Sequence, residues 1–484
     1  MSATSDEATQ GLLAVLKAKQ HQKVDVGAEA MKRWVAEGAD VNARGEFGTT
    51  VLQLALGWPY SSGGTPPDID GIRVLIEAGA DVNARDRQGR TPLLHAIHSS
   101  PSPETETRVS EAVQLLKAAG ARIPSDVKDQ HGGAFTWTSE VLYREILDAG
   151  AAIDGRDEGD RTPLHRMAGR GAPDIVKLLL ERGAEVNALD GQGLTPLGVA
   201  LRTKEEVWVA HNKRTPGFNA TIALLEAAGG RPRVPFTRSD DVFAPFPVDP
   251  EALTKALAGQ KLDLTHPAAS AQEVTTVLQG YGEPEKTFEK LSALRDALGA
   301  EPRKVRIQGP LDLHRVFFHH GDLEVDGDLS IYKPFAVTGN VTVHGVVTDS
   351  ANDSLVAILG HLKCHGLYTD CEFSVQGDIE ARDVVLGYYN DHILAANTLK
   401  AKVVIEDNHA FMATVESPHH FDIDTYSQGY GEGVSERLQA LFVDSVFQER
   451  KEGDDEEEPL RLDRGELFDH ISKGRPVFRE QKDA

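Results

Sequence analysis

A seven-residue motif recurs in the first half of the chain and limits what this half can fold into. Gly-Ala-Asp-Val-Asn-Ala-Arg begins at Gly38 and again at Gly79, and Gly-Ala-Glu-Val-Asn-Ala begins at Gly183. Weaker copies begin at Gly120 and Gly150. Each glycine follows an apolar helical stretch and can supply the positive φ that ends a helix. A single unit of this kind cannot bury its own apolar surface, so successive copies must stack on one another.

A second motif, Thr-Pro-Leu, opens a helix in these units and stands at Thr91, Thr162 and Thr195. Threonine can cap a helix, and proline in the first turn loses only an amide that would be unpaired anyway. Together the two motifs resemble the ankyrin repeat, whose period is about 33 residues. The resemblance covers about residues 8–230. It implies an α-solenoid that binds another protein through its concave face.

The copies that begin at Gly38, Gly79 and Gly120 are farther apart than the ankyrin period of about 33 residues, which indicates inserted loops. We place these loops at 57–67, 99–107 and 203–217. Solenoids tolerate insertions in loops, so we expect the insertions to extend the binding surface. The expected partner-binding residues are aromatic or basic: Trp58, Tyr60, Arg85, Arg87, Arg156 and Trp208. By contrast, we expect His95 and His165 to support neighbouring turns, as a histidine in this motif normally does.

After Arg303 the apolar periodicity changes from helical to alternating. Written in rows with steps of 17 to 21 residues, this segment has an inward apolar column: Val305, Leu323, Val341, Leu362, Ile379 and Leu399. A polar column between the apolar ones faces outward: Arg306, Glu324, Thr342, Lys363, Glu380 and Lys400. A third column places glycines at a corner: Gly309, Gly327, Gly345 and Gly366. Steps of this length are typical of one coil of a parallel β-helix, in which equivalent residues stack about 4.8 Å apart.

The fold class expected is therefore α + β multidomain, an ankyrin-repeat α-solenoid followed by a short parallel β-helix with helical caps. The segments are the array at 1–230, a proline-rich linker and helical cap at 231–303, the β-solenoid at 304–416, and a second cap with an acidic tail at 417–484. We expect both caps to cover the open ends of the solenoid. The rungs loosely resemble bacterial β-solenoids, including bactofilin-like polymer-forming domains, which implies self-association.

The formal charge of −24 at pH 7 bears on the choice of partner. Nucleic acids and anionic membranes would be repelled, whereas a basic protein would be attracted. No apolar run approaches the roughly 20 residues of a membrane span, and residues 1–10 lack the pattern of a signal peptide. Two cysteines, Cys364 and Cys371, do not make a disulfide framework. We therefore expect a cytoplasmic protein that binds another protein.

A metal site is the chemistry that we weighed first. The candidate ligands are Glu324 or Asp326 with His344 and His365. Asp326, His344 and His365 fall in one column on successive rungs, where imidazoles on adjacent rungs could bind a divalent metal. The alternative is that these residues precede corner glycines and satisfy turn amides. The sequence contains no phosphate-binding loop, nucleophile elbow or His-Glu-x-x-His motif. We expect no cofactor and no catalytic residue.

The function expected is a non-enzymatic protein-interaction scaffold. Two alternatives stay open at this point. One is an immunity protein that neutralises a toxin, since strong acidity would suit a basic toxin. The other is a metal-dependent or carbohydrate-active enzyme on the β-solenoid.

Overall fold

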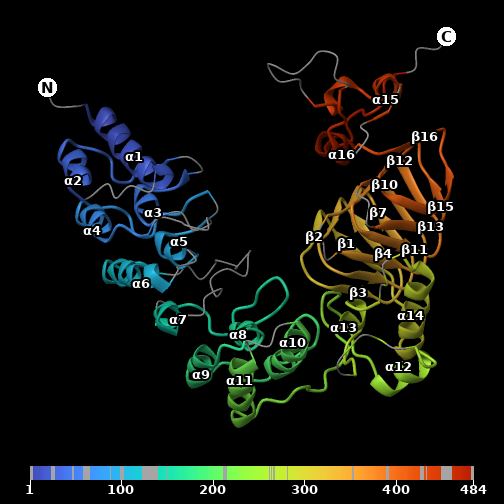
Figure 1. Ribbon diagram of the computed structural model, residues 1–484, viewed down its shortest axis with the longest axis horizontal. Helices are drawn as coiled ribbons and strands as arrows, with labels where there is room; N and C mark the ends of the chain where they lie inside the picture. Colours follow the sequence, from blue (N-terminus) through green and yellow to red (C-terminus); the bar gives the residue numbers. More distant parts are fainter. Residues whose placement is uncertain are drawn as a thin grey trace. The chain divides into compact units, whose positions relative to one another are not determined.

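The computed structural model contains two compact units (Figure 1). The helical unit comprises Met1–Leu189 and Thr195–Val234, and the solenoid unit comprises Asp190–Leu194 and Pro235–Ala484. The described residues are 4–22, 28–45, 48–57, 66–87, 89–98, 103–122, 140–148, 150–210, 215–260, 262, 264, 267–278, 280, 282–350, 354–388, 392–425, 430–431, 433–448 and 460–480. No helix within these ranges is long and apolar enough to cross a membrane.

The helical unit consists of helices that pack in antiparallel pairs and in two rows. Its elements are α1 (Ser5–Gln22), α2 (Ala28–Ala36), α3 (Val51–Ala55), α4 (Ile69–Glu77), α5 (Pro92–His98), α6 (Pro103–Ala118), α7 (Glu140–Asp148), α8 (Pro163–Ala168), α9 (Pro173–Glu181), α10 (Pro196–Ala210) and α11 (Thr215–Ala227). The helices α2, α4, α6, α7, α9 and α11 each contact the next in an outer row, while α1, α3 and α5, and likewise α8 and α10, form the inner row. One continuous apolar core runs between the rows, as the repeat pattern predicts.

The helix boundaries confirm the helix starts and ends predicted from the sequence motifs. Thr162 caps α8, and the glycine of every predicted copy has a positive φ: Gly38 (91°), Gly79 (92°), Gly120 (91°), Gly150 (101°) and Gly183 (86°). A sixth such glycine, Gly229 (84°), ends α11. It was not predicted from the motif because Gly-Arg-Pro follows it, without the alanine that follows every other copy.

Two of the three predicted loops are shorter than expected. The loop at 99–107 ends earlier because α6 begins at Pro103, where a first-turn proline followed by glutamate favours a helix. The loop at 203–217 was wrong over most of its length, since α10 continues to Ala210 through the helix-forming Lys-Glu-Glu at 204–206. Residues 58–65 of the first predicted loop lie outside the described residues.

The asparagine of the Val-Asn-Ala motif joins each repeat to the next. Asn42 donates from Nδ2 to the carbonyl oxygen of Gly79 (3.3 Å) and accepts from the amide of Asp81 (2.7 Å). Asn83 makes the same pair of bonds to Gly120 (3.2 Å) and to Arg122 (3.0 Å). A side chain that both donates and accepts is required here, because the next turn presents a free carbonyl and a free amide.

We predict that Asn83→Ala destabilises the helical unit by about 1–2 kcal/mol, because two backbone groups of the next repeat lose their partner. Chemical denaturation of the full chain, followed by far-ultraviolet circular dichroism, measures the change. Glu77→Ala, at an exposed position of the same repeat, is the matched control. An equal effect of the two substitutions would contradict a role for Asn83 between repeats.

The solenoid unit is a parallel β-helix with three faces. The first face contains β1 (Val305–Gln308), β4 (Leu323–Asp326) and β7 (Val341–Val343), the second β2 (Leu311–Leu313), β5 (Leu329–Ile331) and β8 (Val346–Asp349), and the third β3 (Phe317–His319), β6 (Phe335–Val337), β9 (Leu355–Ile358) and β11 (Glu372–Val375). Longer strands cross a corner and continue two faces: β10 (Leu362–Thr369), β12 (Ile379–Tyr388), β13 (Ile393–Lys400) and β15 (Ala410–Glu416). The second face ends with β14 (Val403–Asp407) and β16 (His419–Ile423).

The predicted register is confirmed residue by residue along the first face. Val305 pairs with Leu323, and the pairing continues through Val341, Leu362, Ile379 and Leu399. The solenoid extends to Ile423, beyond the predicted boundary of 416.

The predicted glycine column was wrong at its last member. Gly345 stacks against Gly327, but Gly366 pairs with Val346 and lies against Phe468. A register shift follows Cys364 on β10 and moves Gly366 out of the column.

A second corner, which the sequence analysis did not identify as a column, is held by side chains that bond to the next rung. Asp322 accepts from the amide of Asn340 (2.8 Å), and Asn340 accepts from the amide of His361 (3.0 Å). His361 Nδ1 accepts from the amide of Asp378 (2.9 Å). Each residue follows a glycine, and these glycines stack so closely that a Cβ on Gly339, Gly360 or Gly377 would meet the backbone of the preceding rung: Gly321, Gly339 and Gly360.

The predicted helical caps lie along two faces of the solenoid, and the residues that pack against the interior core beside the first rung, Val242 and Phe243, come from the linker that precedes those helices. The helices α12 (Pro250–Ala256), α13 (Ala271–Thr275) and α14 (Pro284–Ala297) share a core with outward residues of the third face, Phe318, Ala336 and Ala357. The helices α15 (Val434–Leu441) and α16 (Arg464–Ser472) pack on outward residues of the second face, among them Leu386, Ile405 and Phe421 (Figure 1). These outward columns are apolar and therefore need cover along the whole face.

Asp349, at the end of β8, is fully buried, and burial raises the pKa of its carboxyl group well above its ordinary value. The group stays neutral in the folded chain at pH values where the unfolded chain ionises it. The stability of the solenoid unit therefore falls as pH rises above the ordinary carboxyl range, until the folded-state pKa is reached.

We predict that Asp349→Asn removes this loss. The free energy of unfolding of the variant should exceed that of the natural chain by an amount that grows as pH rises through and above the ordinary carboxyl range. Asp312→Asn, at an exposed position of β2, removes the same charge as a control. A constant difference across this pH interval would show that Asp349 does not titrate with folding.

Candidate functional site

The first face of the solenoid, here called the charged face, carries charged side chains outward. Ion pairs join neighbouring rungs, from Lys304 to Glu324 (3.1 Å), from Lys363 to Glu380 (3.1 Å) and from Lys400 to Glu416 (2.9 Å). The predicted outward column is therefore confirmed, and β15 extends it by one rung. Exposed pairs of this kind are each worth little, roughly 0–1 kcal/mol.

A shallow groove of about 410 Å³ lies on the charged face. It runs between the ion-pair column and the corner column that begins with Asp322 and Asn340. Its lining combines lysines and carboxylates that already bond to one another across rungs. A ligand in this groove would have to compete with those bonds.

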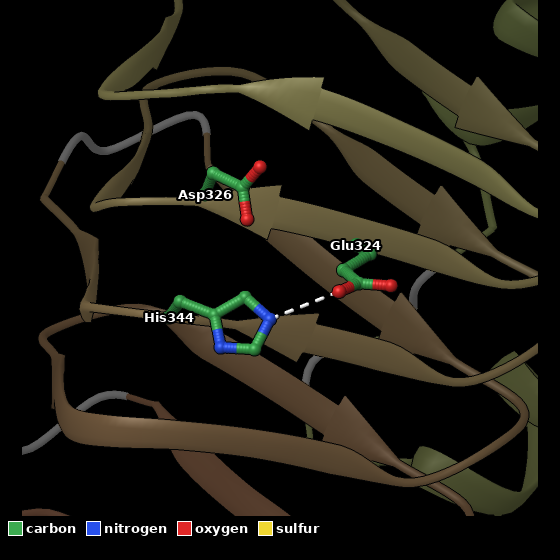
Figure 2. Close-up of side chains that lie close together, drawn as sticks. All are labelled: Glu324, Asp326 and His344. Atoms are coloured by element: carbon green, nitrogen blue, oxygen red, sulfur yellow. Dashed lines mark hydrogen bonds and ion pairs between the residues drawn. The ribbon is translucent and has the colours of Figure 1, made fainter.

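Three residues of the charged face could hold a metal ion by composition. Ligand atoms of Glu324, Asp326 and His344 lie within 4.8 Å of one another (Figure 2). Nε2 of His344 is 3.0 Å from Oε1 of Glu324. The hydrogen bond from His344, followed by the one from Lys304, lowers the pKa of Glu324. The structure thus brings together both predicted carboxylates and His344.

The third predicted residue, His365, does not belong to this group. It lies on β10 between Cys364 and Gly366, where the pairing with β12 shifts in register and the strand leaves the charged face. Burial is the main cause that lowers the pKa of its imidazole. The column of three ligands predicted from sequence was therefore wrong at its last rung, because a local register shift ends the column.

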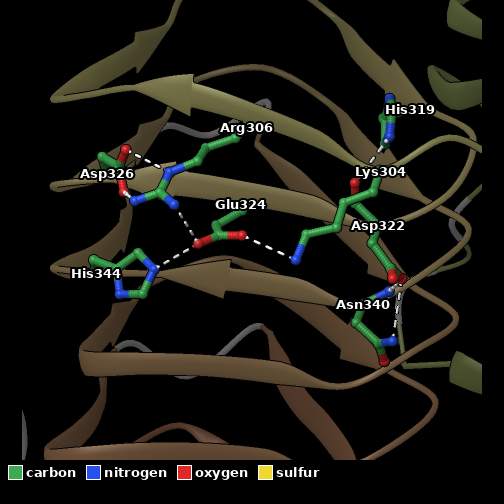
Figure 3. Close-up of polar contacts among 8 residues, drawn as sticks. All are labelled: Lys304, Arg306, His319, Asp322, Glu324, Asp326, Asn340 and His344. Atoms are coloured by element: carbon green, nitrogen blue, oxygen red, sulfur yellow. Dashed lines mark hydrogen bonds and ion pairs between the residues drawn. The ribbon is translucent and has the colours of Figure 1, made fainter.

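A cation from the first rung already occupies the two carboxylates (Figure 3). The guanidinium of Arg306 makes two bonds to Asp326 (2.7 and 2.6 Å) and lies 3.4 Å from Oε1 of Glu324. The hydrogen bond from Arg306 is the main cause that lowers the pKa of Asp326. A bidentate guanidinium is a strong partner for a carboxylate, so a metal ion would have to displace it. The arrangement is that of an ion-pair network.

We predict that Arg306→Ala increases the affinity of Glu324, Asp326 and His344 for zinc, which the natural chain binds only weakly. Affinity for zinc, measured by calorimetry, should rise at least about tenfold, since a bidentate cation no longer competes for the carboxylate oxygens. Adding His344→Ala should abolish the gain. Lys363→Ala removes a cation from the same face as a control. Equal zinc affinity of the natural chain and the Arg306 variant would contradict this account.

The predicted partner-binding residues of the helical unit fall into three groups. Arg85 and Arg87 are exposed on the hairpin that precedes α5. Arg156 is also exposed, but its guanidinium donates to the carbonyl oxygens of Asp160 (2.8 Å) and Leu189 (2.6 Å) and so joins two hairpins. Trp58 and Tyr60 lie outside the described residues, as does the side chain of Trp208 on α10.

The histidines of the helical unit support turns, as predicted. Nδ1 of His165 lies 3.1 Å from the amide and 2.8 Å from the hydroxyl of Thr162 at the start of α8. Nε2 of His95 lies 2.7 Å from the carbonyl oxygen of Gly57 in the preceding repeat. Both histidines are buried.

Some residues that shape these sites were missed from sequence. Arg44 donates to the carbonyl oxygens of Gly48 (3.0 Å) and Arg85 (2.5 Å), which is the role that Arg156 plays two hairpins later in the described chain. The shared motif position, the arginine six residues after a helix-ending glycine, could have revealed it. Arg306 was placed in the outward column, but its diagonal reach to Asp326 follows only from the three-dimensional register.

Comparison with known proteins concerns the helical unit. Family models described as ankyrin repeats (many copies) match residues 65–116 and 146–200. Among solved structures, the human ASB11 ankyrin repeat domain aligns with 54% of this chain and 95% of that chain, at a TM-score of 0.33 and 23% identity. The family models show that the chain contains ankyrin repeats, as the sequence motifs predict.

Three curated relatives share parts of this region. E3 ubiquitin-protein ligase KEG of Arabidopsis thaliana is 41% identical over 88 residues, which are 17% of this chain and 5% of that protein. Ankyrin repeat-containing protein P1E11.10 of Schizosaccharomyces pombe is 38% identical over 66 residues, 14% and 30%. Serine/threonine-protein kinase VIK of Arabidopsis thaliana is 31% identical over 146 residues, 28% and 30%. The matched stretch is thus less than a third of each relative.

Proposed function

We propose that this chain is a non-enzymatic scaffold that binds a partner protein through the hairpins of its ankyrin repeats. The observation that carries the proposal is the set of preformed hairpins, each rigidified by bonds to its own backbone while its charged side chains face solvent. A preformed surface loses little conformational entropy on binding, which favours affinity.

A buried aspartate organises the hairpins at 86–90 and 157–161. Oδ1 of Asp86 accepts from the amide of Arg90 (2.9 Å), and Oδ1 of Asp157 accepts from the amides of Gly159 (2.9 Å) and Arg161 (2.9 Å). The carboxylates are therefore used internally. Arg87, between Asp86 and Arg90, is exposed, and we propose that it contacts the partner protein. Arginine is enriched among residues that dominate binding energy at interfaces.

The net negative charge of the chain comes mostly from the solenoid unit and not from the helical unit that contains the hairpins. Residues 1–234 contain 27 basic and 31 acidic residues, whereas residues 235–484 contain 24 basic and 44 acidic residues. The long-range attraction of a basic partner is therefore expected from the solenoid unit. The partner of the hairpins is instead selected by local contacts such as those of Arg87.

Self-association through the solenoid stays a prediction within this proposal. The support for it is β15, which alternates between exposed and half-buried residues, and whose Met412 is 47% exposed. A strand edge of this kind can pair with another chain.

The test is quantitative capture of partner proteins by the full chain and by Arg87→Glu. We predict that the specific partner is depleted at least about tenfold with the variant, as expected for an interface arginine worth more than 1 kcal/mol. Arg73→Glu, at an exposed position of the outer helix α4, makes the same charge change away from the hairpins. A partner lost equally with both variants, or retained with both, would overturn the proposal.

A further inference from the structure

A second groove, of about 470 Å³, lies between α12 and α14 on the solenoid unit. Its apolar lining includes Phe288 and Ala293 of α14 and the buried Leu257, which directly follows α12. These two helices contact each other, and both contribute to the core that covers the third face. The groove lies at the edge of this helical layer, where Gln376, the residue after β11, completes its lining.

Helix α14 has two distinct faces. One face is buried against the sheet and consists of Pro284, Thr287, Leu291, Leu294 and Ala297. The other face lines the groove and follows helical spacing: Glu285, Phe288, Glu289, Ser292, Ala293 and Asp296. The regular spacing produces a continuous stripe along the helix.

Phe288 belongs to this second face. It is half-buried and is not one of the residues of α14 that are buried against the sheet. A half-exposed aromatic ring in a groove is the usual form of an anchor point for a protein partner.

The rim of the groove is acidic. Glu285, Glu289 and Asp296 are exposed carboxylates, and none of the described residues that line the groove is basic. The cations of α14 point elsewhere or pair locally. Lys286 bonds to Glu283 (2.5 Å), and Lys290 reaches the carbonyl oxygen of Val277 (3.5 Å).

The neighbouring bonds compensate only one of the three carboxylates. Asp296 pairs with Arg295 (2.9 Å), whereas Glu289 accepts from the neutral amide of Gln260 (2.8 Å) and keeps its net charge. The surplus of acidic residues in 235–484 adds a long-range field of the same sign. An apolar floor with a negative rim is complementary to a segment that is apolar on one side and cationic on the other.

We infer that this groove binds a cationic amphipathic helix of a partner protein. From Glu285 to Asp296 the rim spans about 16 Å at 1.5 Å per residue, which matches about three turns of a bound helix. Apolar residues of that helix contact Phe288 and Ala293, and its lysines or arginines lie over the acidic rim. Recognition of this type places an amphipathic helix in an apolar groove.

The inference is independent of the ankyrin hairpins, because its test uses a synthetic probe and leaves Arg87 unchanged. The probe is an amphipathic peptide of about 14 leucine and lysine residues, long enough to follow α14. The same peptide with glutamate in place of lysine is the negative probe. Binding to the full chain is measured by calorimetry at two salt concentrations.

We predict that the leucine–lysine peptide binds and that the leucine–glutamate peptide does not. Phe288→Ala should weaken binding at least about tenfold, as for an anchor residue. The exposed double variant Glu285→Lys/Glu289→Lys leaves the core untouched, so it should abolish binding of the cationic peptide even if Phe288→Ala perturbs the fold. Glu251→Gln, on an exposed position of α12 outside the groove, should have no effect.

Three outcomes would overturn the inference. The cationic peptide fails to bind the natural chain, or it binds the groove variants with unchanged affinity, which places its site elsewhere on the acidic unit. In the third outcome the natural chain is a dimer in solution that Phe288→Ala converts to a monomer, which makes a second copy of the chain the occupant of the groove.

Discussion

Hydrogen bonds from a side chain to the backbone of the next repeat are the interaction on which both units depend. In the helical unit, Asn42 and Asn83 each bond to the turn that ends the following repeat. In the solenoid unit, Asp322, Asn340 and His361 each accept from an amide one rung further on. No repeat buries its own apolar surface, so these bonds fix the register in which neighbouring repeats share a core.

The cover of the solenoid decides where this unit can meet other molecules. Two faces have apolar outward columns, and helices from the segments before and after the solenoid pack on them. The charged face instead satisfies its outward residues with ion pairs between rungs. Burial of apolar area therefore assigns the helices to two faces, and the helical layer then presents the acidic groove of α12 and α14 to solvent.

Charged residues have different roles in the two units. In the helical unit, buried aspartates such as Asp86 and Asp157 organise hairpins, and the overall balance is close to neutral. In the solenoid unit, Arg306 occupies the carboxylates that would otherwise resemble a metal site. The same residue types thus serve architecture in both places, while surplus acidity remains available for long-range attraction.

The sequence by itself determined the repeats, the helix-ending glycines and the strand register from Val305 to Leu399, because these features recur with a local period and each repeat must match its neighbour. Only the tertiary structure decided that the flanking helices lie along the faces, that His365 leaves its column and that Arg306 reaches Asp326. Those outcomes depend on contacts between residues distant in sequence and on a one-residue register shift, and neither leaves a periodic signal.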